Sequence, residues 1–197
     1  MQGMMPPVAV AFGALWLPVV LSAVFVFIGS SLIWTMLKWH NGDWKRVGPE
    51  ADLQEALRKA GVTTGQYMFP HMDPSATDKA AAKQAWQDRY AKGPVGVILA
   101  GTPGTMSMGK MMGRVFVFYL VVSFFVAYIA SHALWQGASY LKVFQVVGAT
   151  TFVAYGAGSF MDSIWFYKSW RSSWLTALDA LIYCGLTAGT FGWLWPR

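Results

Sequence analysis

Four apolar stretches, each long enough to cross a bilayer as a helix, limit what this chain can fold into. They run from about Val8 to Leu37, Val115 to Trp135, Tyr140 to Tyr167 and Trp174 to Trp195. An apolar helix of roughly 20 residues spans the hydrocarbon core of a membrane. Tryptophan and tyrosine lie near the ends of these stretches, as in the aromatic belts of membrane helices. The sequence therefore predicts an all-α protein with a bundle of four transmembrane helices.

The charged residues lie mainly in one segment between the first and second stretches. Only 12% of the 197 residues are charged, whereas a soluble domain carries about a quarter. We therefore expect a first transmembrane helix in residues 1–37, a hydrophilic insertion in residues 38–114, and transmembrane helices two to four in residues 115–197. The net charge is +6, but no basic stripe with interleaved aromatic residues is present, so no nucleic-acid partner is expected.

Within the insertion, the pattern predicts two short amphipathic helices joined by a turn-rich linker. The first runs from Glu50 to a stop at Gly61, with Pro49 at its start. The second runs from Ser75 or Asp78 to Gly93. The linker TTGQYMFPHMDP contains two prolines, which exclude a long helix. The later segment PVGVILAGTPG favours a short strand or hairpin.

The distribution of lysine and arginine predicts the orientation of the chain. The loops after the first and third spans share one side of the membrane. Basic residues near the membrane on that side are Lys38, Lys45, Arg46, Lys110, Arg114, Lys168 and Arg171, against Lys142 and Arg197 on the other. Positive residues stay in the cytoplasm, so the insertion should be cytoplasmic and both termini periplasmic.

Two aspartates, Asp162 and Asp179, are the only carboxylates within the predicted spans. A charge inside a bilayer is costly, so each is a candidate functional residue. Helical spacing places Tyr155 on the face of Asp162 and Tyr183 on the face of Asp179. These polar stripes predict either a paired-carboxylate site for a proton or cation, or aspartates that pair with nearby Lys168, Arg171 or Arg114. His40 and His132 stand alone near helix ends, which is typical of interfacial residues.

The fourth span also carries a glycine face opposite its polar stripe. Gly185, Gly189 and Gly192 share this face, and Gly185-Leu-Thr-Ala-Gly189 matches the GxxxG pattern that lets two helices approach closely. The glycines therefore predict a helix-packing interface, either with the first span or with another protein.

No set of residues in the sequence indicates an enzyme or a cofactor. Met68, His71 and Met72 are ligand types that suit Cu(I), but no CxxC motif accompanies them, and methionine also fills gaps beside apolar surface. No Ser-His-Asp order, HExxH motif or dinucleotide fingerprint is present. We expect no catalytic residue, no metal and no cofactor.

Three stretches carry a family resemblance: GQYMFPHM, GPVGVILAGTPGTMSMGK and ALDALIYCGLTAGTFGWLWP. Through them the chain resembles a group of bacterial inner-membrane proteins of similar length, and the likeness extends over most of the sequence. The resemblance implies four membrane helices and a bacterial cytoplasmic membrane. It implies no activity and no catalytic residue.

Two hypotheses for function follow from these features. The leading one is a non-enzymatic integral membrane subunit, either an accessory or structural component of a larger membrane complex or a homo-oligomer. It depends on the two specialised faces of the fourth span, and its partners would be lipid and other membrane subunits or a second copy. The alternative is a small proton- or cation-coupled carrier that uses Asp162 and Asp179.

Overall fold

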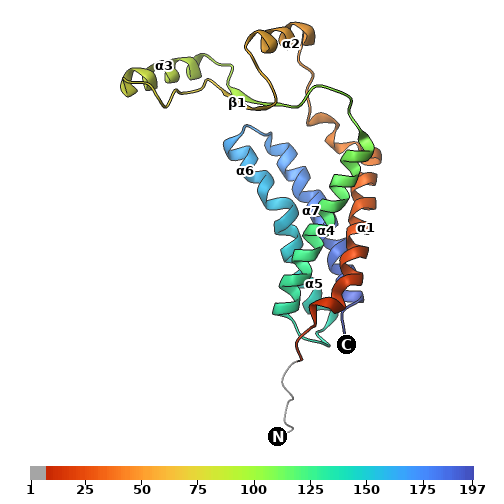
Figure 1. Ribbon diagram of the computed structural model, residues 1–197. Helices are drawn as coiled ribbons and strands as arrows, with labels where there is room; N and C mark the ends of the chain where they lie inside the picture. Colours follow the sequence, from red (N-terminus) through yellow and green to blue (C-terminus); the bar gives the residue numbers. More distant parts are fainter. Residues whose placement is uncertain (1–7) are drawn as a thin grey trace. The chain divides into compact units, whose positions relative to one another are not determined.

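The protein is described by a computed structural model of residues 8–197, which form two compact units (Figure 1). The membrane unit comprises the described part of Met1–Trp44 together with Ser107–Ser163 and Lys168–Arg197. The insertion unit comprises Lys45–Met106 and Ile164–Tyr167. The N-terminal methionine, predicted to be periplasmic, lies outside the described residues.

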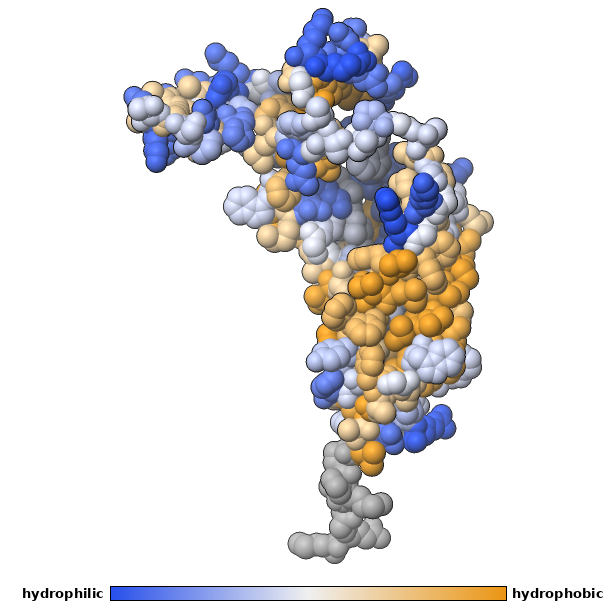
Figure 2. All heavy atoms as spheres, viewed as in Figure 1, coloured by the Kyte–Doolittle hydropathy of each residue, from blue (hydrophilic) through white to orange (hydrophobic). Residues whose placement is uncertain are grey.

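The membrane unit contains four helices that are long and apolar enough to cross a bilayer. The first span joins η1 (Phe12–Leu15), α1 (Trp16–Leu32) and η2 (Ile33–Leu37), and the second is α4 (Met108–Ala133). The third span joins α5 (Tyr140–Phe152), η4 (Val153–Ala157) and α6 (Gly158–Trp165), and the fourth is α7 (Trp170–Trp193). The predicted all-α class and four-helix bundle are confirmed, and the chain is a multi-pass membrane protein. On the face shown in Figure 2, apolar side chains cover the middle of this unit.

Two of the spans begin earlier than the sequence predicts. Helix α4 begins at Met108 rather than Val115, so its first turns include Lys110 and Arg114. Long basic side chains can extend to the membrane interface, and they therefore do not prevent the backbone from being helical there. Helix α7 begins at Trp170 rather than Trp174 because the Ser169 side chain caps it, accepting a hydrogen bond from the backbone N–H of Ser172.

Close packing between the third and fourth spans depends on small residues of both helices. A Cβ atom at Gly148 would lie 3.1 Å from Cys184 Sγ and 3.6 Å from Ala188 Cβ, and one at Gly156 would lie 3.1 Å from Ala180 Cβ. Both glycines thus let α5 and η4 approach α7 more closely than a larger residue would permit.

Two π-helical segments interrupt the spans. They are η2 in the first span and η4 in the third. A π-helical turn shifts the side chains that follow it around the helix axis, and such turns occur often at functional sites. Trp34 lies in η2 and Tyr155 lies in η4, and both line the same cavity described below.

At the end of the bundle that carries the start of the first span, backbone contacts join three segments. Ala9 forms an isolated antiparallel bridge with Trp135. The Gly137 N–H donates to the Pro196 carbonyl, and the Trp195 indole N–H donates to the Trp135 carbonyl at 2.9 Å. Beneath them lies an apolar core that includes Leu15 and Phe191, both fully buried.

The insertion unit contains both predicted helices and a small sheet. Helix α2 (Glu50–Lys59) ends before Gly61, and α3 (Lys79–Lys92) lies between Asp78, whose side chain caps it, and Gly93. Strand β2 (Gly96–Ala100) confirms the predicted strand and pairs antiparallel with β1 (Gly65–Phe69). The linker was predicted to be turn-rich, and the strand β1 within it was not predicted. A strand there requires the partner at β2, which local sequence does not reveal.

Candidate functional site

The two aspartates of the spans lie in different environments. Asp162 is exposed, and its side chain makes no hydrogen bond or ion pair among the described residues. Asp179 is 4% exposed and binds His40. The predicted pairing of Asp162 with Asp179 is therefore not found, and neither aspartate pairs with Lys168, Arg171 or Arg114. His40 was predicted to be an isolated interfacial residue, and that prediction is wrong.

His40 bridges two buried carboxylates. Its Nδ1 lies 2.7 Å from Asp43 Oδ2, and its Nε2 lies 2.9 Å from Asp179 Oδ2. All three side chains are almost fully buried. The Trp34 ring stacks on the imidazole with centroids 4.3 Å apart and planes 7° from parallel. We refer to His40, Asp43 and Asp179 as the carboxylate–imidazole cluster.

A sharp turn after the first span positions His40 and Asp43 together. Lys38 has a φ of 53°, which ends the π-helical segment in the left-handed region. The short helix η3 (Trp39–Gly42) follows, and the Asp43 N–H donates to the His40 carbonyl at 3.0 Å. Residues three apart in such a turn lie on one side, so both side chains face α7.

The two contacts of His40 fix how many protons the cluster holds. A neutral imidazole has one N–H donor and one acceptor, whereas an ionised carboxylate only accepts. Two short nitrogen–oxygen contacts therefore need two protons between them. Either His40 is an imidazolium ion or one of the two carboxyl groups is protonated. In both cases the cluster carries one more proton than a neutral histidine beside two carboxylates.

Asp43 has two further partners that stabilise its charge. Arg171 donates from Nη1 to Asp43 Oδ1 at 2.9 Å and from Nη2 to the Trp39 carbonyl, and Ser172 donates to Asp43 Oδ2 at 3.0 Å. Burial raises the pKa of Asp43, but the hydrogen bonds of His40 and Ser172 and the charges of His40 and Arg171 outweigh burial, so its pKa lies below its ordinary value. With His40 protonated and Arg171 included, the two positive charges balance the two carboxylates.

Three tyrosines from three spans form an aromatic group next to Asp179. Ring centroids are 5.4 Å apart for Tyr155 and Tyr183, 5.8 Å for Tyr119 and Tyr155, and 6.1 Å for Tyr119 and Tyr183. The predicted site residues Tyr155 and Tyr183 are thus brought together, and Tyr119 of α4 joins them. Tyr119 could not be identified from the sequence, because it lies in the middle of an apolar helix.

A cavity of about 250 Å³ opens at this aromatic group, and all four spans line it. Its lining consists of Trp34, Val115, Phe118, Tyr119, Tyr155, Thr176, Asp179 and Tyr183. Among the described residues, two of these have a buried polar atom with no hydrogen-bond partner: Asp179 at Oδ1 and Tyr155 at its hydroxyl oxygen. The Trp39 indole N–H is also buried without a well-formed hydrogen bond, and it interacts with the Asp179 carboxylate from outside the cavity lining. Buried polar atoms are normally satisfied, so an unpartnered pair lining one cavity is a candidate ligand site.

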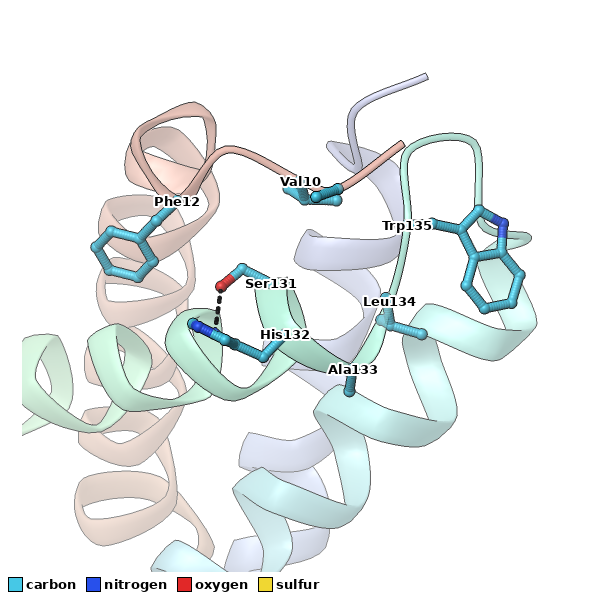
Figure 3. Close-up of a pocket in the computed structure, with 8 residues that line it drawn as sticks. Val10, Phe12, Ser131, His132, Ala133, Leu134 and Trp135 are labelled. Carbon is cyan, nitrogen blue, oxygen red and sulfur yellow. Dashed lines mark hydrogen bonds between the residues drawn. The ribbon is translucent and has the colours of Figure 1, made fainter. Parts of the chain in front are cut away.

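A larger cavity lies far along the sequence from the cluster, where the second span ends (Figure 3). Val10, Phe12, Ser131, His132, Leu134 and Trp135 are among its lining residues. Its serine hydroxyl and one of its histidine nitrogens are already engaged. Ser131 donates to the Tyr128 carbonyl, and His132 Nδ1 lies 2.8 Å from the same oxygen. None of its lining residues has a buried side-chain polar atom that lacks a partner among the described residues, so we assign the candidate site to the smaller cavity.

A separate polar cluster, made of one lysine and several hydroxyl side chains, lies near the start of α7. Lys168 donates to Ser159 Oγ at 2.7 Å and to Thr176 Oγ1 at 3.5 Å. Ser173 lies within hydrogen-bond distance of both Ser159 and Ser163. Hydroxyls rather than a carboxylate therefore satisfy the Lys168 ammonium group, and Thr176 connects it with the cavity lining.

The three glycines of the predicted interface do not act as one face. A Cβ atom at Gly192 would lie 2.6 Å from the Tyr140 ring, and one at Gly189 would lie 3.7 Å from the Tyr140 hydroxyl. These two glycines accommodate α5 within the bundle. Gly185 is exposed, and a Cβ atom there would meet nothing within 4 Å. Only Gly185 remains available to an outside helix.

The weak metal candidates lie in the insertion unit. Met68 is on β1, and Met68 and Met72 are both largely exposed, while the His71 carbonyl accepts a hydrogen bond from Arg89. Within residues 8–197, no group of three or more histidine, cysteine, aspartate or glutamate side chains is arranged to hold a metal ion.

Comparisons of the chain with protein-family models, with curated proteins and with solved structures found no match.

Proposed function

We propose that this protein is a small proton- or cation-coupled carrier of a bacterial cytoplasmic membrane, and that Asp179 is its ion-binding residue. The observation that supports this proposal is the buried Asp179 carboxylate, with one oxygen bound to His40 and the other unpartnered beside a cavity. Ionisable residues among membrane helices are costly to bury, and they commonly mark ion or proton pathways.

The cluster has the parts that a proton site needs. It holds one exchangeable proton, as the His40 contacts require, and its positive and negative charges balance when that proton is present. Loss of the proton would leave one uncompensated negative charge among buried side chains. Such a charge favours the return of a proton or the entry of another cation.

Proton flux into vesicles tests the proposal. The full chain is reconstituted into liposomes that contain a pH-sensitive dye, an alkali or small ammonium salt is present as the exchanging cation, and an imposed pH gradient is followed over time. We expect the protein to dissipate the gradient faster than empty liposomes do, and we expect Asp179→Asn and His40→Gln to abolish the difference.

Asp162→Asn is the matched control, because Asp162 is the same residue type in a neighbouring span but is exposed and unpartnered. We expect this variant to retain the flux. Equal loss in both aspartate variants would instead support the paired-aspartate site predicted from the sequence, and no flux above empty liposomes would overturn the carrier proposal.

A second candidate is a non-enzymatic membrane subunit that associates with itself or with a larger complex. The exposed Gly185 supports it, because open space at this glycine leaves room for the backbone of another helix. Leu178 and Leu181 are exposed on the same helix. The two candidates are compatible, since a carrier built from four helices would gain a complete pathway by dimerising.

The orientation belongs to the same proposal. The insertion is cytoplasmic and both termini are periplasmic, because lysine and arginine gather beside the first and third loops of the chain. The carboxylate–imidazole cluster, which includes the turn after the first span, would then face the cytoplasm.

A further inference from the structure

We propose that the cavity beside Asp179 binds a small organic ammonium ion, in exchange for the extra proton of the carboxylate–imidazole cluster. The inference rests on the proposed function and names the class of cation that the same site takes. It is carried by the unpartnered Asp179 oxygen and the aromatic lining of the cavity.

The lining matches an organic cation better than a metal ion. Five of its eight residues are aromatic: Trp34, Phe118, Tyr119, Tyr155 and Tyr183. The face of an aromatic ring attracts a cation, most strongly where water is excluded, and aromatic groups of this kind bind quaternary ammonium ions. Alkali and alkaline-earth ions instead require several oxygen ligands, and here a carboxylate, a threonine hydroxyl and tyrosine hydroxyls are spread around a largely apolar wall.

The size of the cavity restricts the ligand further. A volume of about 250 Å³ lies below the range of roughly 300–1,000 Å³ for drug-sized ligands. It exceeds by several times the roughly 30 Å³ that one water molecule occupies in the liquid. The fit is therefore to an ammonium ion with a few short alkyl groups.

The charges around Asp179 require the exchange. Charged or titratable groups of the neighbouring elements are His40 and Asp43 at the turn after the first span, Tyr119 on α4, Tyr155 on η4, Lys168 before α7, and Arg171 and Tyr183 on α7. With His40 protonated, the carboxylate–imidazole cluster and Arg171 are neutral together. A further cation would then have no counter-charge, and Lys168 would repel it.

Release of one proton provides that counter-charge. When the ammonium ion enters, the extra proton that joins His40 Nε2 and Asp179 Oδ2 leaves to solvent, and the neutral imidazole keeps its Nδ1–H for Asp43. The Asp179 carboxylate then faces the ammonium ion instead of His40. One positive charge enters and one leaves, so the net charge of the site is unchanged. Because the two cations compete for one carboxylate, a higher pH strengthens ammonium binding.

The π-helical segments carry two of the aromatic residues that line the site. Trp34 lies in η2 and both lines the cavity and stacks on His40. It therefore contacts both the proton site and the proposed ammonium site. Tyr155 lies in η4 and presents its unpartnered hydroxyl group among the lining residues.

Choline serves as the probe, and its neutral carbon analogue 3,3-dimethyl-1-butanol is the control for shape. Binding to the full chain in lipid nanodiscs is followed by calorimetry. We expect saturable binding of choline, weaker binding of the neutral analogue by about tenfold or more, and release of a proton measured as a dependence of the binding heat on the buffer. We also expect the choline affinity to increase as the pH is raised.

Variants at Tyr155 separate binding from folding. Tyr155→Phe retains the ring and should retain choline affinity within about threefold, whereas Tyr155→Leu should lower it by about tenfold or more. Asp179→Asn should remove both the affinity and the proton release, and a thermal melt establishes that each variant is folded.

The outcomes distinguish this inference from the proposed function. Proton flux through liposomes that depends on Asp179, without preference for choline over its neutral analogue, would overturn the ammonium site and leave the proton carrier standing. Preferential choline binding with proton release, but without any flux, would retain the site and overturn the carrier. Equal binding by Tyr155→Phe and Tyr155→Leu would overturn the aromatic contact.

Discussion

At the scale of single residues, His40 decides the charge state of the bundle. It contacts Asp43 and Asp179 at once, and Trp34 covers its ring. Removing one member of a buried ion pair leaves the other charge unmatched, which costs more than the pair itself contributes. Replacing one member of the cluster should therefore lower the stability of the fold strongly. Replacing two paired members together should lower it much less.

We therefore expect His40→Leu to lower the free energy of unfolding by about 3–5 kcal/mol, because Asp179 becomes a buried carboxylate with no partner. The double variant His40→Leu/Asp179→Leu should recover most of that loss. Unfolding titrations in detergent measure both. A double variant as unstable as the sum of the two single ones would show that the side chains do not interact.

Asp43 makes the stability of the folded state depend on pH in the acid range. Its folded pKa lies below that of an unfolded aspartate, so the ionised form stabilises the folded state. This stabilisation is present above the unfolded pKa of about 3.9 and is lost as the pH falls through the lower folded pKa. We expect the melting temperature to fall as the pH drops below about 4, and to fall less steeply in Asp43→Asn. Parallel pH curves for the two proteins would contradict the assigned hydrogen bonds.

The residue scale is also where the sequence was least informative. Asp179 was identified from the cost of a charge in a membrane helix, and Tyr155 and Tyr183 from helical spacing. His40 was not, because it lies 139 residues from Asp179 and only the folded bundle joins them. The one local signal was its spacing of three residues from Asp43, just beyond the end of the first span.

At the scale of helices, small residues decide which faces approach one another. The glycine face of α7 was predicted to be a packing interface, but two of its three glycines, Gly189 and Gly192, accommodate Tyr140 rather than a backbone. Between the third and fourth spans, Gly148 and Gly156 instead lie against small residues of α7. Motif matching could not identify this pairing because the glycines are eight residues apart and the π-helical η4 begins between them.

Two glycine-to-leucine variants distinguish the internal face from the exposed one. Gly156→Leu should destabilise the folded protein by about 1–3 kcal/mol, because even a Cβ atom there lies 3.1 Å from Ala180 Cβ. Gly185→Leu should leave the melting temperature unchanged, since its surroundings are open. If the protein self-associates through Gly185, the same variant should shift it from oligomer to monomer in light scattering. A large loss of stability in Gly185→Leu would place that glycine inside the bundle.

At the scale of the whole molecule, hydropathy and length predicted the four membrane helices, because the bilayer dictates both. Charge and turn residues likewise predicted α2 and α3. The small sheet was only half predicted, since its two strands lie about 30 residues apart and each is stabilised by the other. The start of α4 was wrong because lysine and arginine were counted as insertion residues although their long side chains can extend from a membrane helix.

The orientation of the chain can be tested with single cysteines in the full-length protein. The one natural cysteine, Cys184, is replaced by alanine, and a cysteine is then placed at the exposed Gln87 or at Arg197. Seven basic residues flank the membrane on the side of the insertion against two on the other, so Gln87 should be cytoplasmic and Arg197 periplasmic. A membrane-impermeant maleimide should therefore label Arg197→Cys in intact cells and Gln87→Cys only after the membrane is opened, with Cys184→Ala alone as the unlabelled control. Labelling of Gln87→Cys in intact cells would show that the orientation is the reverse.

In that orientation the carboxylate–imidazole cluster would face the periplasm, and the exchanged proton would come from outside the cell. Copper binding at Met68, His71 and Met72 would then have to be considered again.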